Sequence, residues 1–252
     1  MTRALPAADR KLPSVGAPIG EDESNTSAAV RQMFSDIAPR YDLLNHLLSC
    51  NIDRLWWRRT ARIFAYILRR DETRALDLCC GTGDMAKALR KQTPRAQIIG
   101  IDFSRGMLTR GRRKFDAHCV SAVESDALHL PFRDRSFDVV VSAFGLRNLA
   151  NYDAGLREIH RVLRPDGEIG VLDFSEPGGL LGKVYGFYFR KVLPRIGTLI
   201  SGVTGPYSYL PASVSRFPAP NALLERMSAI GYTDVQWQPY SFGIAGLYRG
   251  RK

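Results

Sequence analysis

The chain has 252 residues, of which 45% are hydrophobic and 24% charged, and its 36 Lys and Arg outnumber its 25 Asp and Glu to give a net charge of +11. This composition is typical of a globular protein and argues against a disordered chain, a collagen or a coiled coil. No stretch approaches the roughly 18 apolar residues of a membrane-spanning helix, and the length suits one large domain or two small ones, at roughly 100–200 residues each.

The excess positive charge is concentrated near the C-terminal end. Residues 176–252 hold nine basic and three acidic residues, which is more than half of the net charge. Such a field favours an anionic partner, either nucleic acid or the negative surface of a membrane. The same charge could also serve solubility alone.

The cysteines and the N-terminal residues indicate a cytoplasmic protein. Cys50, Cys79, Cys80 and Cys119 show no zinc-ligand spacing, so we expect free thiols in a reducing compartment and no metal. The first residues lack the apolar core of a secretory signal, and their acidic residues argue against an organellar transit peptide. We expect residues 1–26 to be a mobile tail.

Residues 27–252 are predicted to form a single domain in three parts. The first, 27–70, is a helical cap in which Pro39 interrupts the apolar periodicity and a last helix runs over about 53–69. The second, 74–175, alternates strands with helices, which predicts a parallel sheet covered by helices on both faces. Its expected strands are 75–79, 97–102, 118–125, 137–143 and 168–174, and its expected helices are 84–91, 104–115 and 152–163.

The third part, residues 176–252, is expected to face the substrate and a membrane. Interrupted helix is expected over 178–199 and a loop over 205–220, which is rich in Pro, Ser and Tyr. A helix from Asn221 to about Gly231 and two last strands, 235–240 and 244–249, complete the domain.

A glycine turn after the first strand carries the strongest chemical signal. The run from Asp77 through Gly81, Thr82 and Gly83 joins a strand to a helix. Glycine at such a turn lets the backbone approach a bound ligand closely. The same spacing also fits a dinucleotide fingerprint.

Acidic residues at successive strand ends point to one ligand crevice. Asp102 ends the second strand, 19 residues beyond Gly83, where a carboxylate can accept both hydroxyls of a ribose. Asp126 follows the third strand and could accept a bond from an adenine amino group. The carboxylates of Asp77 and Asp84 lie where a dinucleotide would place its pyrophosphate, so we favour S-adenosylmethionine, whose sulfonium and ammonium groups tolerate them.

Four blocks spanning about residues 30–252 resemble the ubiquinone/menaquinone biosynthesis C-methyltransferases, most closely those of the menaquinone branch. They are Phe34 to Asn45 with Arg54-Leu-Trp56, then Leu76 to Asp84, then Leu130 through Asn148 with Arg161 to Gly167, and last Leu172 to Pro177 with Leu193 to Gly197, Tyr209-Leu and Phe217-Pro. The segments Leu76 to Asp84 and Arg161 to Gly167 are shared by many methyltransferases, whereas Phe34 to Asn45 and Phe144-Gly-Leu-Arg147-Asn148 are narrower. Asp166 replaces the first glycine of the family's Pro-Gly-Gly turn, and Pro211-Ala-Ser follows Tyr209-Leu where the family has other residues, so the quinone head group stays open.

The resemblance implies an α/β fold, a doubly wound seven-strand Rossmann-like class I methyltransferase, with S-adenosylmethionine as methyl donor. It implies C-methylation of a prenylated quinol, demethylmenaquinol to menaquinol, or alternatively the 2-methoxy-6-polyprenyl-benzoquinol of the ubiquinone branch. By position, Thr82, Asp102, Asp126 and Ala127 match the family's cofactor residues.

Methyl transfer to carbon requires an electron-rich ring carbon in line with the sulfonium. A quinol supplies it on losing a hydroxyl proton, so the protein must hold the reactants in line and stabilise the quinolate oxygen. We expect Arg147, which is always protonated, and Asn148 to stabilise that oxygen, although Asn148 could instead cap a helix. Tyr41 could bond the substrate or the cofactor's carboxylate, or be a core aromatic.

The substrate's isoprenoid tail would require contact with a bilayer, so we expect the enzyme to lie at the inner face of the cell membrane. Residues 183–200 combine aromatic, aliphatic and basic residues and could lie on that interface or line a tail groove. They could also form an ordinary amphipathic helix that covers the sheet or the face of a homodimer.

Two other functions are compatible with parts of the sequence. The positive charge would suit an RNA methyltransferase, but we find no aromatic-and-basic stripe of the stacking kind, and we expect no nucleic-acid partner. The alternative of a cofactor-binding relative that has lost its activity and serves as a scaffold is opposed by the intact Gly81, Gly83, Asp102 and Arg147, which show no sign of decay.

Overall fold

The computed structural model describes residues 22–38, 49, 51–177, 182, 186 and 206–252. Its centre is a seven-stranded sheet with the order β3-β2-β1-β4-β5-β7-β6. The strands are β1 (Arg74–Leu78), β2 (Gln97–Asp102), β3 (Ser121–Glu124), β4 (Phe137–Ala143), β5 (Leu163–Phe174), β6 (Thr233–Tyr240) and β7 (Ala245–Arg251).

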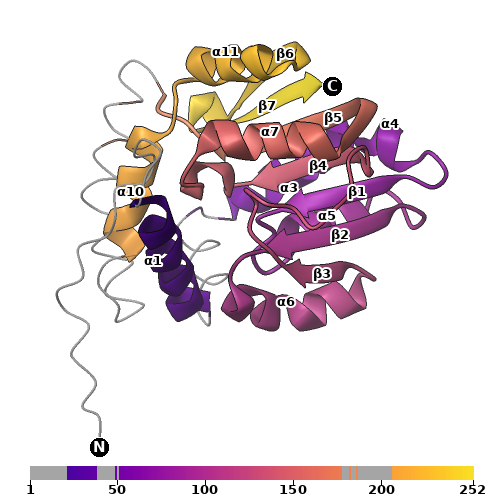
Figure 1. The fold of residues 1–252 in the computed structure, drawn as a ribbon, viewed down its shortest axis with the longest axis horizontal. Coiled ribbons are helices and arrows are strands. Elements are labelled where there is room, and N and C mark those ends of the chain that lie inside the picture. Colours follow the sequence, from indigo (N-terminus) through magenta and orange to yellow (C-terminus); the bar gives the residue numbers. More distant parts are fainter. Residues whose placement is uncertain (1–21, 39–48, 50, 178–181, 183–185, 187–205) are drawn as a thin grey trace, which may run out of the picture.

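The strands β1 to β5 pair in parallel, as expected. The prediction of a parallel sheet does not extend to the last pair, since β7 inserts between β5 and β6 and runs antiparallel to both. All carboxyl ends of the parallel strands therefore meet at one edge. Figure 1 shows α1 (Asp22–Ile37) and α10 (Pro206–Arg216) close together beyond one end of the sheet.

Two hydrophobic layers sandwich the sheet, which confirms the doubly wound architecture. One layer packs α7 (Tyr152–Val162) and α11 (Pro220–Ile230) on the first face. The other packs α3 (Ile52–Ile63), α4 (Ala65–Leu68), α5 (Asp84–Arg90) and α6 (Arg105–Ala117) on the second. Both sides of β4 are buried, so its Val139-Val-Val141 run is apolar throughout rather than alternating.

The helical cap differs from its prediction at two places. The first helix begins at Asp22, inside the expected tail of residues 1–26. Its polar first turns carry no apolar periodicity by which the sequence could have revealed them. The expected helix over 53–69 is two helices, α3 and α4, separated at the fully buried Phe64.

The segment 205–220, predicted as a loop, is mostly the helix α10, and the prediction was wrong. Tyr209, Ser213 and Phe217 are buried at intervals of four residues, as one face of a helix requires. Pro211 lies inside this helix, and its presence, with the polar composition, concealed the periodicity. The expected interrupted helix over 178–199 lies almost wholly outside the described residues.

The described residues contain no helix both long and apolar enough to cross a membrane. Within the same ranges, no three His, Cys, Asp or Glu side chains gather where they could hold a metal ion. Cys79, Cys80 and Cys119 are free thiols.

Candidate active site

A cleft of about 680 Å³, including its open mouth, lies where the carboxyl ends of the parallel strands meet. The walls come from the loops after β1, β3 and β4, the end of β2, and Phe34 of α1. Five predicted site residues line it: Gly81, Asp102, Asp126, Ala127 and Asn148.

The glycine loop is shaped by left-handed backbone. Gly81 and Gly83 have φ values of 54° and 90°, which glycine adopts without strain. At Gly83 a Cβ atom would lie 2.4 Å from the ring of Phe115, so this glycine permits the packing of α6 against the loop. Gly83 is therefore needed for the loop's shape and does not line the cleft, whereas Gly81 does.

Asp102 organises the floor of the cleft. Its Oδ2 accepts the backbone N–H of Gly81 at 2.8 Å and its Oδ1 accepts that of Ser104 at 2.9 Å. A carboxylate has about four acceptor positions, so one on each oxygen is left for two further donors, as a ribose diol would need. Burial raises the pKa of Asp102 to about 6, and the two backbone N–H groups oppose the shift in part.

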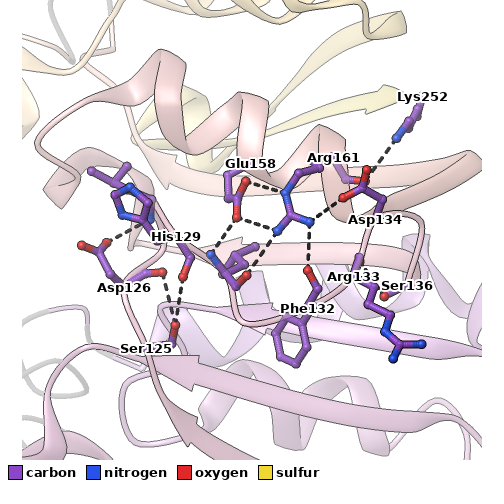
Figure 2. Close-up of polar contacts among 12 residues, drawn as sticks. Ser125, Asp126, His129, Phe132, Arg133, Asp134, Ser136, Glu158, Arg161 and Lys252 are labelled. Carbon is purple, nitrogen blue, oxygen red and sulfur yellow. Dashed lines mark hydrogen bonds and ion pairs between the residues drawn. The ribbon is translucent and has the colours of Figure 1, made fainter.

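The loop after β3 brings Asp126 and Ala127 to the cleft wall. The backbone N–H of Leu128 donates to Asp126 Oδ1 at 2.9 Å, and that of His129 donates to the Asp126 carbonyl at 3.1 Å. These bonds close a tight turn, visible at the left of Figure 2. Ala127 and Leu128 of this loop, with Ile101 of β2, form an apolar part of the cleft wall beside the carboxylate of Asp102.

Arg161 of α7 holds this loop from behind, at the centre of Figure 2. Its guanidinium donates to the carbonyl oxygens of Phe132 at 2.8 Å and Leu130 at 3.2 Å. It also donates twice to Glu158, at 2.8 and 2.7 Å, and once to Asp134 at 2.7 Å. Glu158 Oε1 in turn accepts the Leu130 N–H at 2.7 Å. The motif that begins at Arg161 thus ties the loop to the helix.

Replacing Arg161 with lysine is expected to loosen the loop. Lysine is a compact donor that cannot reproduce five bonds in a planar fork, so the amides of residues 126–132 should exchange hydrogen faster and affinity for S-adenosylmethionine should fall about tenfold. Hydrogen exchange and calorimetric titration measure the two effects. Arg157→Lys, at an exposed position of the same helix, is the matched control. Unchanged exchange in Arg161→Lys would contradict the expectation.

Asp77 and Thr82 lie behind the cleft wall. Asp77 is fully buried in β1 and neither carboxylate oxygen has a hydrogen-bond partner among the described residues. Burial, with the charges of Asp102 and Asp84, raises the pKa of Asp77 well above the usual range. The nearby backbone N–H of Ala86 lowers this pKa in part, although it is not positioned to form a hydrogen bond with the carboxylate. Thr82 is also buried, and Lys114 Nζ donates to its hydroxyl at 3.3 Å. Direct cofactor contact by either residue stays a prediction.

Arg147, predicted to stabilise the quinolate oxygen, does not point into the cleft. Its guanidinium is buried, donating to Asp173 Oδ1 at 2.8 Å and to the Phe144 carbonyl, and it stacks 5.2 Å from the ring centre of Phe174. Asp173 is fully buried, and burial raises its pKa while Arg147 lowers it in part. The positive charge therefore lies within the wall of the cleft, and its role toward an acceptor stays a prediction.

Asn148 is held in the cleft wall by two hydrogen bonds. Its Nδ2 donates to the Phe144 carbonyl at 3.1 Å, and its Oδ1 accepts the hydroxyl of Tyr209 at 3.2 Å. Asn148 lies in the short helix η3 (Leu146–Asn148), while the next helix, α7, is capped by Asn151. Tyr209 is not among the predicted site residues, because the sequence predicts a loop where α10 lies. Tyr41 lies outside the described residues.

Aromatic rings line and back the side of the cleft formed by the loop after β4. Phe144 lines the cleft with φ 60°, and its ring centre lies 4.6 Å from that of Phe174 and 5.9 Å from that of Trp56. The cleft thus joins a polar, acidic floor to an aromatic wall. This arrangement can hold a polar nucleoside-like molecule beside a flat apolar ring.

Comparison with known proteins decides the family. The model of the ubiE/COQ5 methyltransferase family matches residues 22–252. The chain belongs to this family. It is 46% identical to the demethylmenaquinone methyltransferase of Deinococcus radiodurans over 93% of its own length and 97% of that protein. It is 48% identical to that of Thermus thermophilus over 86% and 99% of the two chains.

Solved structures confirm the fold expected of a ubiE/COQ5 methyltransferase. A SAM-dependent methyltransferase of Thermotoga maritima aligns with a TM-score of 0.63 and 20% identity, covering 88% of this chain and 99% of that one. The [4+2]-cyclase SpnF aligns with a TM-score of 0.66 and 19% identity, over 94% and 98%. Since this second neighbour is a cyclase, the fold alone does not fix the reaction, and the family membership makes this chain a methyltransferase.

Proposed function

We propose that this chain methylates a ring carbon of a prenylated quinol with S-adenosylmethionine as donor, converting demethylmenaquinol to menaquinol. The observation that carries the proposal is 46–48% identity, over nearly the whole chain, to two demethylmenaquinone methyltransferases. The cleft supports the proposal because its polar floor suits the methyl donor and its aromatic wall suits the quinol.

The donor side of the cleft is the polar floor. Asp102 accepts the two ribose hydroxyls through its remaining lone pairs, while Asp126 accepts from the adenine amino group beside Ala127. Gly81, which adds no side chain, lets the backbone approach the bound molecule. When bound, S-adenosylmethionine supplies an electrophilic methyl group on its sulfonium.

The acceptor side is the aromatic wall, where Asn148 and Phe144 face the cleft. Phe144 offers a flat apolar surface to the quinol ring, and the amide of Asn148 is held in place by Tyr209. Arg147 stabilises the quinolate oxygen by its charge, from within the wall. The transfer would form a carbon–carbon bond as the bond from sulfur to the methyl group breaks. The proton of the methylated carbon would then leave to water, and the ring oxygen would take up a proton to restore the quinol.

The substrate's lipid tail implies a peripheral position at the inner face of the cell membrane. The net charge of +11 supports this, because anionic lipids attract basic proteins. The stretch 183–200, predicted to contact the membrane or a second copy of the chain, lies outside the described residues except for residue 186. A homodimer therefore stays a prediction made from the sequence.

Labelled S-adenosylmethionine and two reduced acceptors test the proposed reaction. One acceptor is a short-tailed demethylated naphthoquinol and the other a methoxy-prenyl-benzoquinol, included because a 42% identical relative from Geobacter sulfurreducens is named for both ubiquinone and menaquinone biosynthesis. We expect a labelled methyl group on the naphthoquinol ring. Binding of the donor without transfer to either quinol would overturn the proposal.

A further inference from the structure

Two elements that contact each other, α3 and the β6–β7 connection, each carry a large exposed apolar side chain. Leu55 of α3 is 57% exposed, and Phe242 of the short helix η5 (Ser241–Gly243) is 88% exposed. Trp56 Nε1, next to Leu55, donates to Ser241 Oγ, next to Phe242, at 2.9 Å. This bond fixes α3 against the β6–β7 connection, so the elements that carry the two exposed side chains lie together.

The backbone holds Phe242 outward at the cost of strain. Ser241, Phe242 and Gly243 all have left-handed φ values, of 45°, 59° and 88°, which a non-glycine residue rarely adopts. The Ser175 hydroxyl, donating to the Gly243 carbonyl at 2.7 Å, and the bond from Trp56 anchor this turn. Strain of this kind persists where the surroundings enforce it, and it is concentrated at functional sites.

The exposed charge that α3 contributes to this surface is positive. The exposed charged residues of α3 are all arginines, and its single acidic residue, Asp53, is buried. Arg59, four residues beyond Leu55 on the same face, stacks 4.4 Å from the ring centre of Tyr240, the residue that precedes η5. The exposed arginines of α3 are Arg54, Arg58, Arg59 and Arg62.

This surface is continuous with the aromatic wall of the cleft. Trp56, which connects α3 to η5, has its ring centre 5.9 Å from that of Phe144, and Phe144 lines the cleft. Trp56 therefore connects α3 and η5 to the wall on the acceptor side.

We propose that the surface formed by Leu55, Phe242 and the arginines of α3, here named the α3–η5 surface, docks on an anionic membrane. The two apolar side chains enter the boundary between headgroups and acyl chains, and the arginines bind lipid phosphates. The role of this docking in catalysis rests on the proposed function, because docking there places the acceptor side of the cleft beside the bilayer that holds the quinol. A membrane fits better than RNA, since the aliphatic Leu55 cannot stack on a base as an aromatic side chain does, whereas both apolar side chains can enter the lipid boundary.

The Phe242→Gly variant tests membrane docking without lowering the stability of the fold. Glycine adopts the left-handed φ of position 242 without strain, so this variant should be at least as stable as the wild type in denaturant. It removes the most exposed ring, so its affinity for vesicles of phosphatidylcholine with phosphatidylglycerol should fall about tenfold in co-sedimentation. Arg58→Gln should lower the same affinity about fivefold.

Two matched controls lie away from the α3–η5 surface. Val123→Ser removes an exposed apolar side chain from β3, at the opposite edge of the sheet, and Arg157→Gln removes an exposed charge from α7, on the other face. Neither should change vesicle affinity. Wild-type affinity in Phe242→Gly, or retention of the wild type on RNA but not on vesicles, would overturn the proposal.

Methyl transfer to the short-tailed naphthoquinol in buffer distinguishes this proposal from the proposed function. Phe242→Gly should keep that activity, because it needs no membrane. A chain that methylates no quinol but loses vesicle binding through Phe242→Gly would refute the proposed function and support docking. A chain that methylates the naphthoquinol but binds vesicles equally well with and without Phe242 would refute docking alone.

Discussion

Replacing Asp102 with alanine is expected to weaken binding of S-adenosylmethionine by at least about 100-fold. Two hydrogen bonds from ribose hydroxyls to a buried carboxylate contribute roughly 1.5–3 kcal/mol each, and the substitution also frees the N–H groups of Gly81 and Ser104 that shape the loop. Calorimetric titration measures the loss. Asp138→Ala removes a carboxylate paired with Arg164 at the other end of β4 and should leave affinity unchanged.

The pH dependence provides an internal check on Asp102. Its pKa of about 6 in the folded chain is above that of an unfolded aspartate. Protonation removes acceptor capacity, so affinity should fall about tenfold from pH 7 to pH 5. The contribution of this group to stability has the opposite trend, being present at low pH and lost as the pH rises through about 6. Asp102→Asn should abolish both trends, and a pH dependence that survives in this variant would contradict the assignment.

Breaking the ion pair between Arg147 and Asp173 is expected to have the largest effect on stability. Both groups are buried, and removal of one partner leaves an uncompensated charge, at a cost of about 3–5 kcal/mol. Arg147→Ala and Asp173→Ala should each lower the free energy of unfolding by that amount in denaturant titrations. The double variant Arg147→Met/Asp173→Leu should recover most of it, because apolar residues of similar size can replace a buried pair.

The double variant also tests the proposed role of Arg147 in the reaction. It should bind S-adenosylmethionine normally, since neither residue lines the cleft, and it should have a lower kcat because the charge behind the acceptor is gone. A folded double variant with the kcat of the wild type would show that the pair is structural only. A loss of donor affinity without a loss of kcat would reverse the assignment.

The parallel core could be predicted because its signals are local. The apolar run in β4 and the glycine turn after β1 each report a buried strand or a sharp turn within a few residues. The helix α10 could not be predicted, because Pro211 and the polar residues around it resemble a loop until packing buries one face. Tertiary contacts decide such segments, and local propensity does not.

The candidate site shows the same difference between features set by local sequence and features set by tertiary contacts. Asp102 and Asp126 could be found from their positions at strand ends, which share one edge in any parallel sheet. The partners of Arg161 and Arg147 could not, because Leu130 and Asp173 lie 31 and 26 residues away in the chain. The sequence shows only that each arginine belongs to a motif. The role of each guanidinium depends on which carbonyl or carboxylate group the fold places beside it.

The insertion of β7 between β5 and β6 has a consequence for assembly on the ribosome. The strands β1 to β5 can pair as they emerge, but β5 then presents an open edge until residues 245–251 arrive. A nascent chain stalled before that point would expose a row of unpaired amides able to recruit another chain. A frameshift within the codons for residues 245–251 would accordingly be more damaging than the loss of a peripheral strand, because it would leave two strands without their common neighbour.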